Sequence, residues 1–331
     1  MNKNTHYTNY IKLFVLFTTL IFFLILVELS FRLFYPLIYN YNMEMWRYSR
    51  EIKTPTNNPK LPFIHKPNKK ANLYSVDIET DSNGFRVNGT KRNFRGKVLF
   101  LGDSFTLGWG VESTETFSNL FQEMCNENGK KIQTINAGCG NYNTIMEVEL
   151  LKSKCIKLKP EIIIFNYYIN DMENTPKRIS SLKYFLMTKF YLYGFLFNKY
   201  AQIKSKYDSD FKMNYYRNIY NKNNMVANTS ALQELVDICK ENNIKLLITN
   251  IPDLRILHNY PYKYANDYIR DTAIKLKTEY LDLYSLIKEE NPESLWVSIE
   301  DPHANSYANK IFALAMYKKI QELNWLIEDN K

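Results

Sequence analysis

The sequence predicts an α/β domain with a parallel sheet, preceded by an apolar helix near the N-terminus. From residue 97 onward, short apolar runs of strand length alternate with longer helical segments. Such alternation is typical of a parallel sheet that helices cover on both faces. The 331 residues are 45% hydrophobic and 15% aromatic, which excludes a disordered or fibrous chain. They suffice for one large domain with additions.

The run Ile11–Val27 is almost unbroken hydrocarbon and is close to the shortest length that spans a bilayer as a helix. Apolar character resumes after Glu28 and Arg32, which lie four residues apart and are able to pair on one helix face. No cleavage site of small residues follows, so we expect residues 1–39 to form an uncleaved single-pass membrane anchor. Basic residues lie on both sides of the run and give no clear orientation.

Residues 40–95 are expected to form an extended spacer and an entry segment. Four prolines punctuate its polar first half, at positions 55, 59, 62 and 67. A turn signal follows at Asp81–Gly84, and we expect the neighbouring Arg86 to pack the entry of the domain rather than face a ligand.

Residues 96–331 carry the predicted α/β domain. The expected strands are 98–101, 132–136, 161–166, 244–251 and 280–283, and the expected helices are 114–128, 144–158, 228–241, 262–277 and 305–323. The segment at about 174–225 breaks this rhythm and is too long for a plain connection. We interpret it as a helical insertion, either a lid over the site or a face turned toward the membrane. Its lysines leave too short an apolar run for a second spanning helix.

Charge and cysteine content narrow the function further. The net charge of +9 comes from scattered lysines, which favours a soluble basic surface, with some attraction to anionic lipid or glycan, over nucleic-acid binding. The four cysteines show no metal-ligand spacing, so we expect no zinc site, and buried thiols are the default interpretation. A disulfide stays open for a domain outside the cytoplasm.

A serine follows the first predicted strand of the domain almost directly. The strand ends at Gly102, and Asp103 leads into Ser104. Open α/β sheets build their sites at the carboxyl ends of their strands, so Ser104 is a candidate nucleophile. The alternative is that Asp103 and Ser104 only cap a turn or helix.

Three later segments supply the partners that a nucleophilic serine needs. Serine requires an adjacent base, and His303 is the best candidate of four histidines, with His258 the weaker rival. Asp301 is near enough in sequence to orient that base. Donors for a developing oxyanion are expected from the Ser104 backbone, a glycine-containing loop at 136–144, and the amide of Asn170.

These segments resemble the SGNH/GDSL hydrolase family, over roughly residues 98–323. The resemblance rests on Gly102–Ser104, the glycine loop, Asn170–Asp171 and Asp301–His303. It implies a flavodoxin-like three-layer α/β/α sandwich, with Ser104 as nucleophile, His303 as base, Asp301 as its partner and Asn170 as an oxyanion donor. It implies neither a cofactor nor a metal.

The chain departs from the family pattern at several positions. Asn141 stands where the family's second conserved segment has a glycine that supplies a backbone donor, which leaves open whether Gly138, Gly140 or Asn141 supplies that amide. Tyr168 replaces a glycine and is expected to narrow the pocket. The spacing that the family often uses would make Glu300 the triad acid. We favour Asp301 and keep Glu300, with Asp103 and Asp171, as secondary candidates.

The sequence therefore predicts a membrane-anchored serine esterase with its catalytic domain outside the cytoplasm. Its expected substrate is an O-acyl ester of a cell-envelope glycan or lipid, by analogy with such enzymes. An O-acyltransferase of surface polysaccharide that uses the same site is an alternative. A non-catalytic envelope-assembly or glycan-binding module, and a lipase with an aromatic lid, are others.

Overall fold

The computed structural model describes residues 3–34, 41–89, 96–177, 181–196, 199 and 211–326. The chain divides into two compact units. The first unit contains the described residues up to Arg50 together with 181–199, and the second contains the rest, from Glu51 onward. Parts of the predicted spacer (40 and 90–95) and of the predicted insertion (178–180, 197, 198 and 200–210) lie outside the described residues.

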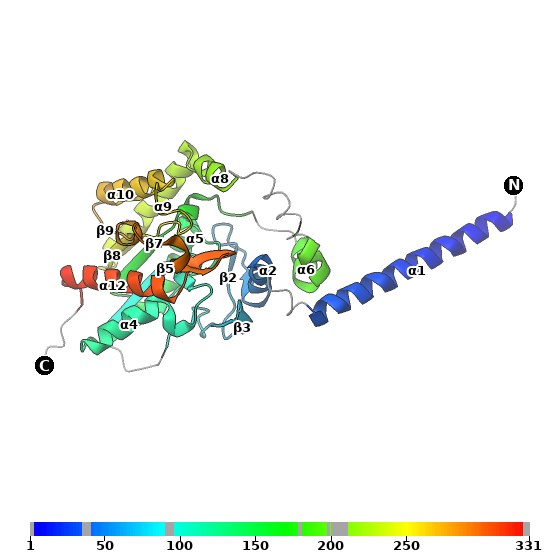
Figure 1. Ribbon diagram of the computed structural model, residues 1–331, viewed down its shortest axis with the longest axis horizontal. Helices are drawn as coiled ribbons and strands as arrows, with labels where there is room; N and C mark the ends of the chain where they lie inside the picture. The colour runs from blue at the N-terminus through cyan, green and yellow to red at the C-terminus, as the bar shows by residue number, and fades with distance from the viewer. Residues whose placement is uncertain are drawn as a thin grey trace. The chain divides into compact units, whose positions relative to one another are not determined.

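A five-stranded parallel sheet forms the centre of the second unit (Figure 1). Its strands are β5 (Gly96–Gly102), β6 (Ile132–Asn136), β7 (Ile162–Tyr167), β8 (Lys245–Asn250) and β9 (Glu279–Asp282). They lie in the order β6-β5-β7-β8-β9, so numbering these five along the chain gives 2-1-3-4-5, the flavodoxin-like order. This confirms the predicted fold class. The order reverses at β5, the strand that leads into Ser104.

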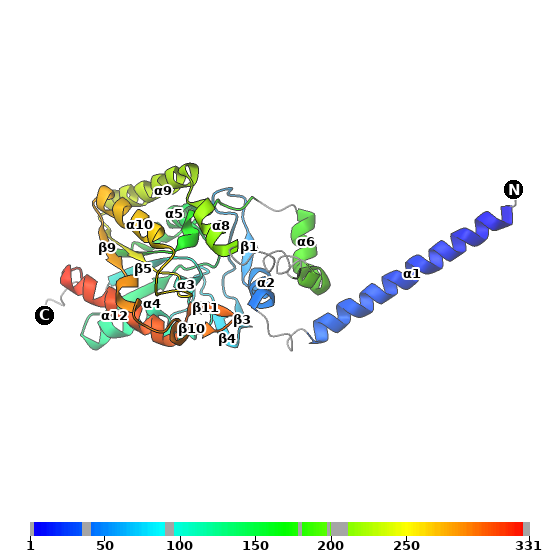
Figure 2. The ribbon, with the colours of Figure 1, turned by 45° about the horizontal axis from the view of Figure 1, so that its top comes forward.

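Helices cover both faces of the sheet. The helices are α3 (Ser104–Leu107), α4 (Phe117–Glu127), α5 (Thr144–Ser153), α9 (Lys222–Glu241), α10 (Lys263–Leu276), α11 (Tyr284–Ile287) and α12 (Ser306–Glu322). Figure 2 shows α4 and α12 on one side of the sheet and α9 and α10 on the other. Successive side chains of β5 point to opposite faces of the sheet. Phe100 belongs to the core cluster that contains Phe117 and Phe312, and Leu99 belongs to the cluster that contains Leu235.

Local sequence sets the beginnings of these helices. The side chains of Thr116, Asn143, Asn221 and Asn305 each accept a backbone N–H as the N-cap of α4, α5, α9 and α12. Because Asn221 caps α9, this helix begins six residues earlier than the predicted helix 228–241. The remaining short helices are η2 (Ser113–Glu115), η3 (Cys155–Leu158), η4 (Ile169–Met172) and η5 (Pro292–Leu295).

The structure differs from the extended spacer expected for residues 40–95. Two antiparallel pairs form here, β1 (Lys53–Pro55) with β2 (Phe63–His65) and β3 (Lys70–Leu73) with β4 (Val76–Glu79), and α2 (Tyr41–Glu51) precedes them. Burial alternates along β3, and apolar side chains such as Leu73 and Ile78 are fully buried. The extended spacer was expected because of the prolines, but proline also occurs at strand ends and in turns.

An additional hairpin, β10 (Trp296–Ser298) with β11 (Asp301–Ala304), precedes α12 and was not predicted. It carries both Asp301 and His303. The hydroxyl of Tyr74, in the β3–β4 turn, lies 2.6 Å from Ser298 Oγ. The entry segment therefore packs against the hairpin that holds two site residues.

The first unit contains α1 (Lys3–Phe34), most of α2 and α6 (Ser181–Lys189). Residues Asn9–Phe34 of α1 have a mean hydropathy of 2.5, and only 6% of the most apolar window is buried. By length and composition, α1 is able to cross a membrane, although a signal sequence near an N-terminus satisfies the same criteria. The other described helix of the predicted insertion, α8 (Phe211–Ile219), belongs to the second unit.

Candidate active site

A tight turn at the end of β5 presents Ser104. Asp103 is the N-cap of α3, and its carboxylate accepts the Phe105 N–H at 2.9 Å. A Cβ at Gly102 would lie 2.0 Å from Thr106 Oγ1 and 3.1 Å from the Asn166 carbonyl oxygen, so only glycine fits here. Asp103 therefore caps a helix, and Ser104 stands at the carboxyl end of the strand.

Arg86 fixes the far end of α3. It is 2% exposed, and its guanidinium donates to the carbonyl oxygens of Leu107 (2.7 Å), Gly108 (2.5 Å) and Val111 (2.6 Å). Leu107 and Gly108 stand at the C-terminal end of α3, where carbonyl oxygens have few partners within so short a helix, so a buried cation is well suited to bind them. This is the packing role expected for Arg86.

The structure brings Ser104, His303 and Asp301 together in a hydrogen-bonded row. Ser104 Oγ lies 2.8 Å from His303 Nε2, and His303 Nδ1 lies 2.5 Å from Asp301 Oδ1. All three side chains are buried. Glu300 is exposed in the turn of the β10–β11 hairpin, and His258 is exposed in the loop that follows β8. The geometry favours Asp301 over Glu300, and His303 over His258.

Trp109 is a site residue that the sequence analysis missed. Its indole Nε1–H donates to Asp301 Oδ2 at 2.8 Å, and the side chain is 1% exposed. Asp301 therefore has both carboxylate oxygens engaged, one by the imidazole and one by the indole. No local pattern marks Trp109, because its partner lies 192 residues away in the chain.

The loop after β6 passes very close to α3. A Cβ at Gly138 would lie 2.1 Å from the Leu107 backbone nitrogen, so this position requires glycine for close approach and not for a positive φ. The Gly138 N–H donates to Asn136 Oδ1, and the Cys139 N–H donates to the Gly102 carbonyl oxygen. Asn141 follows with φ of +66°, a left-handed conformation that asparagine tolerates better than most residues.

Lys53 is a second residue that the sequence analysis missed, and it holds this loop. Its ammonium donates to the Gly140 carbonyl oxygen at 2.5 Å and to Asn141 Oδ1 at 3.1 Å. The Gly140 carbonyl and the Asn141 N–H belong to one trans peptide and point in opposite directions. Lys53 thereby fixes the direction of the Asn141 N–H. Burial lowers the pKa of Lys53 from 10.5 to about 8.

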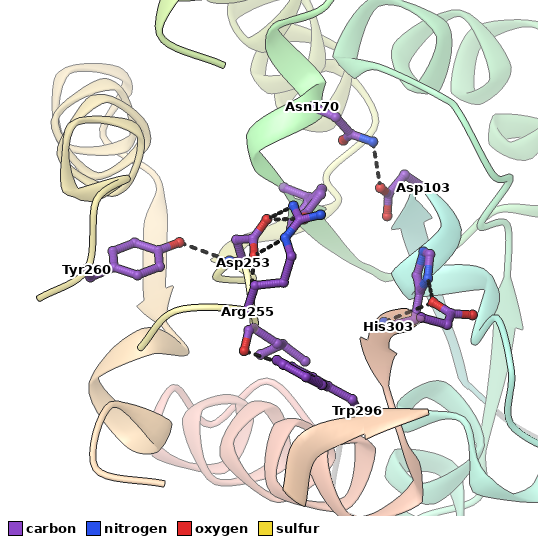
Figure 3. A network of polar contacts seen from close by, with 10 residues as sticks. Asp103, Asn170, Asp253, Arg255, Tyr260, Trp296 and His303 are labelled. Carbon is purple, nitrogen blue, oxygen red and sulfur yellow. Dashed lines mark hydrogen bonds and ion pairs between the residues drawn. The ribbon is translucent and has the colours of Figure 1, made fainter. Parts of the chain in front are cut away.

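Among the described residues, the backbone N–H groups of Ser104 and Asn141 donate to no other group. They remain available for an oxyanion. Asn170, in η4, directs its amide Nδ2 to Asp103 Oδ2 at 3.1 Å, as Figure 3 shows. Asp171 instead faces inward, where its Oδ2 accepts the Tyr168 N–H at 2.8 Å. Its position indicates that it shapes the turn that presents Asn170.

Three of the buried carboxyl groups in this part of the molecule have raised pKa values. Burial raises the pKa of Asp103, and it raises the pKa values of Asp171 and Glu147 well above their ordinary range. After burial, the largest cause of the raised pKa of Asp171 is the charge of Asp103. For Glu147, the largest cause after burial is the charge of Asp171. Burial thus disfavours the ionised forms of these three carboxyls, which lie close enough to influence one another's pKa values.

Tyr168, the residue that replaces the family glycine, forms part of an aromatic wall beside His303. Its ring centroid lies 4.6 Å from that of Phe105, which lies 4.9 Å from that of His303. The Tyr168 hydroxyl donates to Asp253 Oδ2 at 2.9 Å, and Asp253 pairs with Arg255 (Figure 3). The ring is 7% exposed and is held in place by these contacts.

Comparisons with known proteins give one family match. The model of the GDSL-like lipase/acylhydrolase family matches residues 100–311, which is more than half of the chain. A search of curated proteins found no significant match.

Several solved structures are similar to this chain. A putative lipolytic protein of the G-D-S-L family from Desulfitobacterium hafniense is 13% identical and covers 68% of this chain and 99% of its own, with a TM-score of 0.45. The lipase/acylhydrolase from Enterococcus faecalis is 13% identical and covers 69% and 97%, also with a TM-score of 0.45. The esterase EstA from Pseudoalteromonas is 13% identical and covers 70% and 99%, again with a TM-score of 0.45.

Proposed function

Because the chain belongs to the GDSL-like lipase/acylhydrolase family, we propose that it is a membrane-anchored serine esterase with Ser104, His303 and Asp301 as its catalytic residues. The single observation that carries the proposal is the row from Ser104 Oγ through His303 to Asp301, with separations of 2.8 and 2.5 Å. A serine hydroxyl becomes an effective nucleophile when a base of this kind takes its proton.

The reaction follows from these contacts. His303 Nε2 takes the Ser104 proton as Oγ attacks the ester carbonyl, and Asp301 stabilises the imidazolium that forms. The imidazolium returns the proton to the leaving alcohol, which leaves an acyl group on Ser104. Water, deprotonated in turn by His303, attacks the acyl-enzyme and releases the carboxylic acid.

The negative charge of each tetrahedral intermediate needs donors that are already in place. The N–H groups of Ser104 and Asn141, together with the Asn170 amide, are the proposed donors. The Asn170 amide faces Asp103 in the structure, so a small side-chain rotation would bring it to the oxyanion. Lys53 keeps the Asn141 peptide oriented, and it does not itself contact the reacting atoms.

The proposed substrate is an O-acyl ester on a cell-envelope glycan or lipid. The apolar α1 supports an anchor in a membrane, and an anchored esterase acts on esters that are held near that membrane. We place the catalytic domain outside the cytoplasm on the same reasoning. An O-acyltransferase of surface polysaccharide would use the same acyl-enzyme, with a sugar hydroxyl in place of water.

Hydrolysis of p-nitrophenyl acetate by the full chain in detergent micelles tests this proposal. We expect turnover and labelling by a fluorophosphonate in the wild type, and loss of both in S104A. We expect H303N to lose turnover as well. Full activity in both variants would refute the assignment of the site. Supplying an acetylated glycan together with an acceptor glycan then separates hydrolysis from transfer, because only transfer yields a newly acylated acceptor.

A further inference from the structure

Within the first unit, the insertion is attached to α1 by specific polar contacts. The Glu28 carboxylate accepts the backbone N–H groups of Tyr191 and Leu192, each at 3.0 Å. Arg32 pairs with Glu28 at 3.0 Å and donates to the Lys189 carbonyl oxygen at 2.8 Å. Glu28 and Arg32, the two charged residues in the C-terminal part of α1, thus both hold the break between α6 and the helical turns that begin at Tyr191.

These contacts explain how a carboxylate is accommodated at the edge of an apolar span. An ionised glutamate near hydrocarbon is costly unless it is paired and hydrogen-bonded. Glu28 has a cation and two backbone donors, and its side chain is 12% exposed. The donors lie at the start of a helical segment, where a negative charge is favoured. Removal of the insertion would take away both backbone donors and leave this charge paired with Arg32.

The insertion nevertheless exposes large apolar side chains. Leu182 is 68% exposed, Phe185 50% and Leu196 56%. A groove of about 470 Å³ lies between the insertion and α1, with a lining that is almost entirely apolar. Its walls include Ile25 and Leu29 of α1.

We propose that the insertion at 181–196 is a second membrane element, in which these exposed side chains contact lipid and an acyl chain of the bilayer occupies the groove. The inference rests on the proposed role of α1 as a membrane anchor. Ile25 and Leu29 belong to the apolar span Asn9–Phe34, so a bilayer that surrounds this span also surrounds the groove that these residues line. Acyl chains are the apolar partner present at that depth, and an exposed apolar surface of this kind in water would favour aggregation.

Depth-dependent fluorescence quenching of the full chain in phosphatidylcholine–phosphatidylglycerol vesicles tests the inference. In the variant L182C, one added cysteine replaces Leu182 and carries an environment-sensitive fluorophore. The quenchers are a spin label on the lipid acyl chain and iodide in water. The four native cysteines are buried and free, and the chain without an added cysteine sets the labelling background. L16C, on α1, reports on the anchor, and I274C, on α10 of the second unit, is the water-exposed control.

We expect the L182C probe to be quenched by the acyl-chain label as strongly as the L16C probe and to be protected from iodide. The I274C probe is expected to show the reverse. E28A should release the insertion and reduce the lipid quenching of L182C without changing that of L16C.

The outcomes separate the inference from the anchor on which it rests. Lipid quenching at L16C together with iodide quenching at L182C would overturn the inference and leave the anchor in place. Iodide quenching at both positions would refute the anchor itself. Protection of L182C from both quenchers, with a disulfide between two copies of the unlabelled L182C chain, would show that a second copy covers this surface and would also overturn the inference.

Discussion

Replacement of Lys53 by methionine separates the stability of the loop 136–144, called the oxyanion loop for its proposed role, from its function. Lys53 is 5% exposed and donates to the Gly140 carbonyl oxygen and to Asn141 Oδ1. Methionine has nearly the same length and fills the same space, but it has neither the charge nor the donors. The substitution therefore removes the group that directs the Asn141 N–H while it disturbs the packing little.

The expected effect on stability is small, because two large contributions oppose each other. Burial lowers the pKa of Lys53 from 10.5 to about 8. At about 1.4 kcal/mol per pH unit, this difference corresponds to a cost of about 3 kcal/mol at neutral pH, which K53M relieves. K53M also leaves the buried Gly140 carbonyl without this donor, which costs about 1–3 kcal/mol. We expect a free energy of unfolding within about 2 kcal/mol of wild type.

The expected effect on catalysis is larger. Loss of one oxyanion donor in serine hydrolases lowers kcat by about 100- to 1000-fold. In K53M the donor is still present but its direction is no longer fixed, so we expect kcat to fall by about 10- to 100-fold with little change in KM. Steady-state hydrolysis of p-nitrophenyl acetate measures both constants, and urea unfolding followed by tryptophan fluorescence measures stability.

The matched control is K66M. Lys66 is half-buried near the end of β2 and donates to the Glu51 carbonyl oxygen at 3.2 Å. We expect its kcat to stay within about twofold of wild type. A kcat of K53M within the same range would refute the positioning role of Lys53. An equal loss in both variants would show that the effect is not specific to the oxyanion loop.

Four further variants test other contacts. D301N should lower kcat at least about a thousandfold, because the imidazolium loses its stabilising charge. E300Q should leave kcat within about twofold of wild type. A larger loss of kcat in E300Q than in D301N would make Glu300 the triad acid. W109F removes the indole donor to Asp301 Oδ2. A hydrogen bond to a charged group is worth about 1.5 kcal/mol, so kcat should fall about tenfold. An unchanged kcat would contradict a positioning role for Trp109. Burial lowers the pKa of His65 from 6.5 to about 3, so the folded protein keeps this ring neutral. The stability that the neutral ring contributes is fully present above pH 6.5 and is lost as the pH falls toward 3. Wild type should lose about 2 kcal/mol between pH 6.5 and pH 5 in urea unfolding, H65N should lose less, and equal slopes would refute a buried neutral histidine.

Strong local patterns made the sheet and most of its helices predictable. Strands β5, β7 and β8 are short, mainly apolar runs that are buried on both faces, and such runs are recognisable because parallel strands need no alternation. The candidate residues Ser104 and Asn170 were found because each follows a predicted strand, and His303 was found as the best placed of four histidines, just before the last predicted helix. Position along the chain, rather than a contact, identified them.

Contacts between distant parts of the chain leave little trace in the local sequence. Nothing local distinguishes Trp109 or Lys53, because their partners lie 192 and 87 residues away. The segment of 51–89 looked like a linker because its strands are only three or four residues long and its prolines dominate the pattern.

By itself, the sequence determined the alternation of strands and helices, the family, and the residue types from which a serine hydrolase site is built. Periodicity and short motifs encode these features locally. Only the tertiary structure decided that Asp301 rather than Glu300 lies against His303, that Lys53 holds the oxyanion loop, and that Glu28 and Arg32 hold the insertion. Each of these depends on which side chains the completed fold brings within hydrogen-bond distance, and chain separation does not encode that distance.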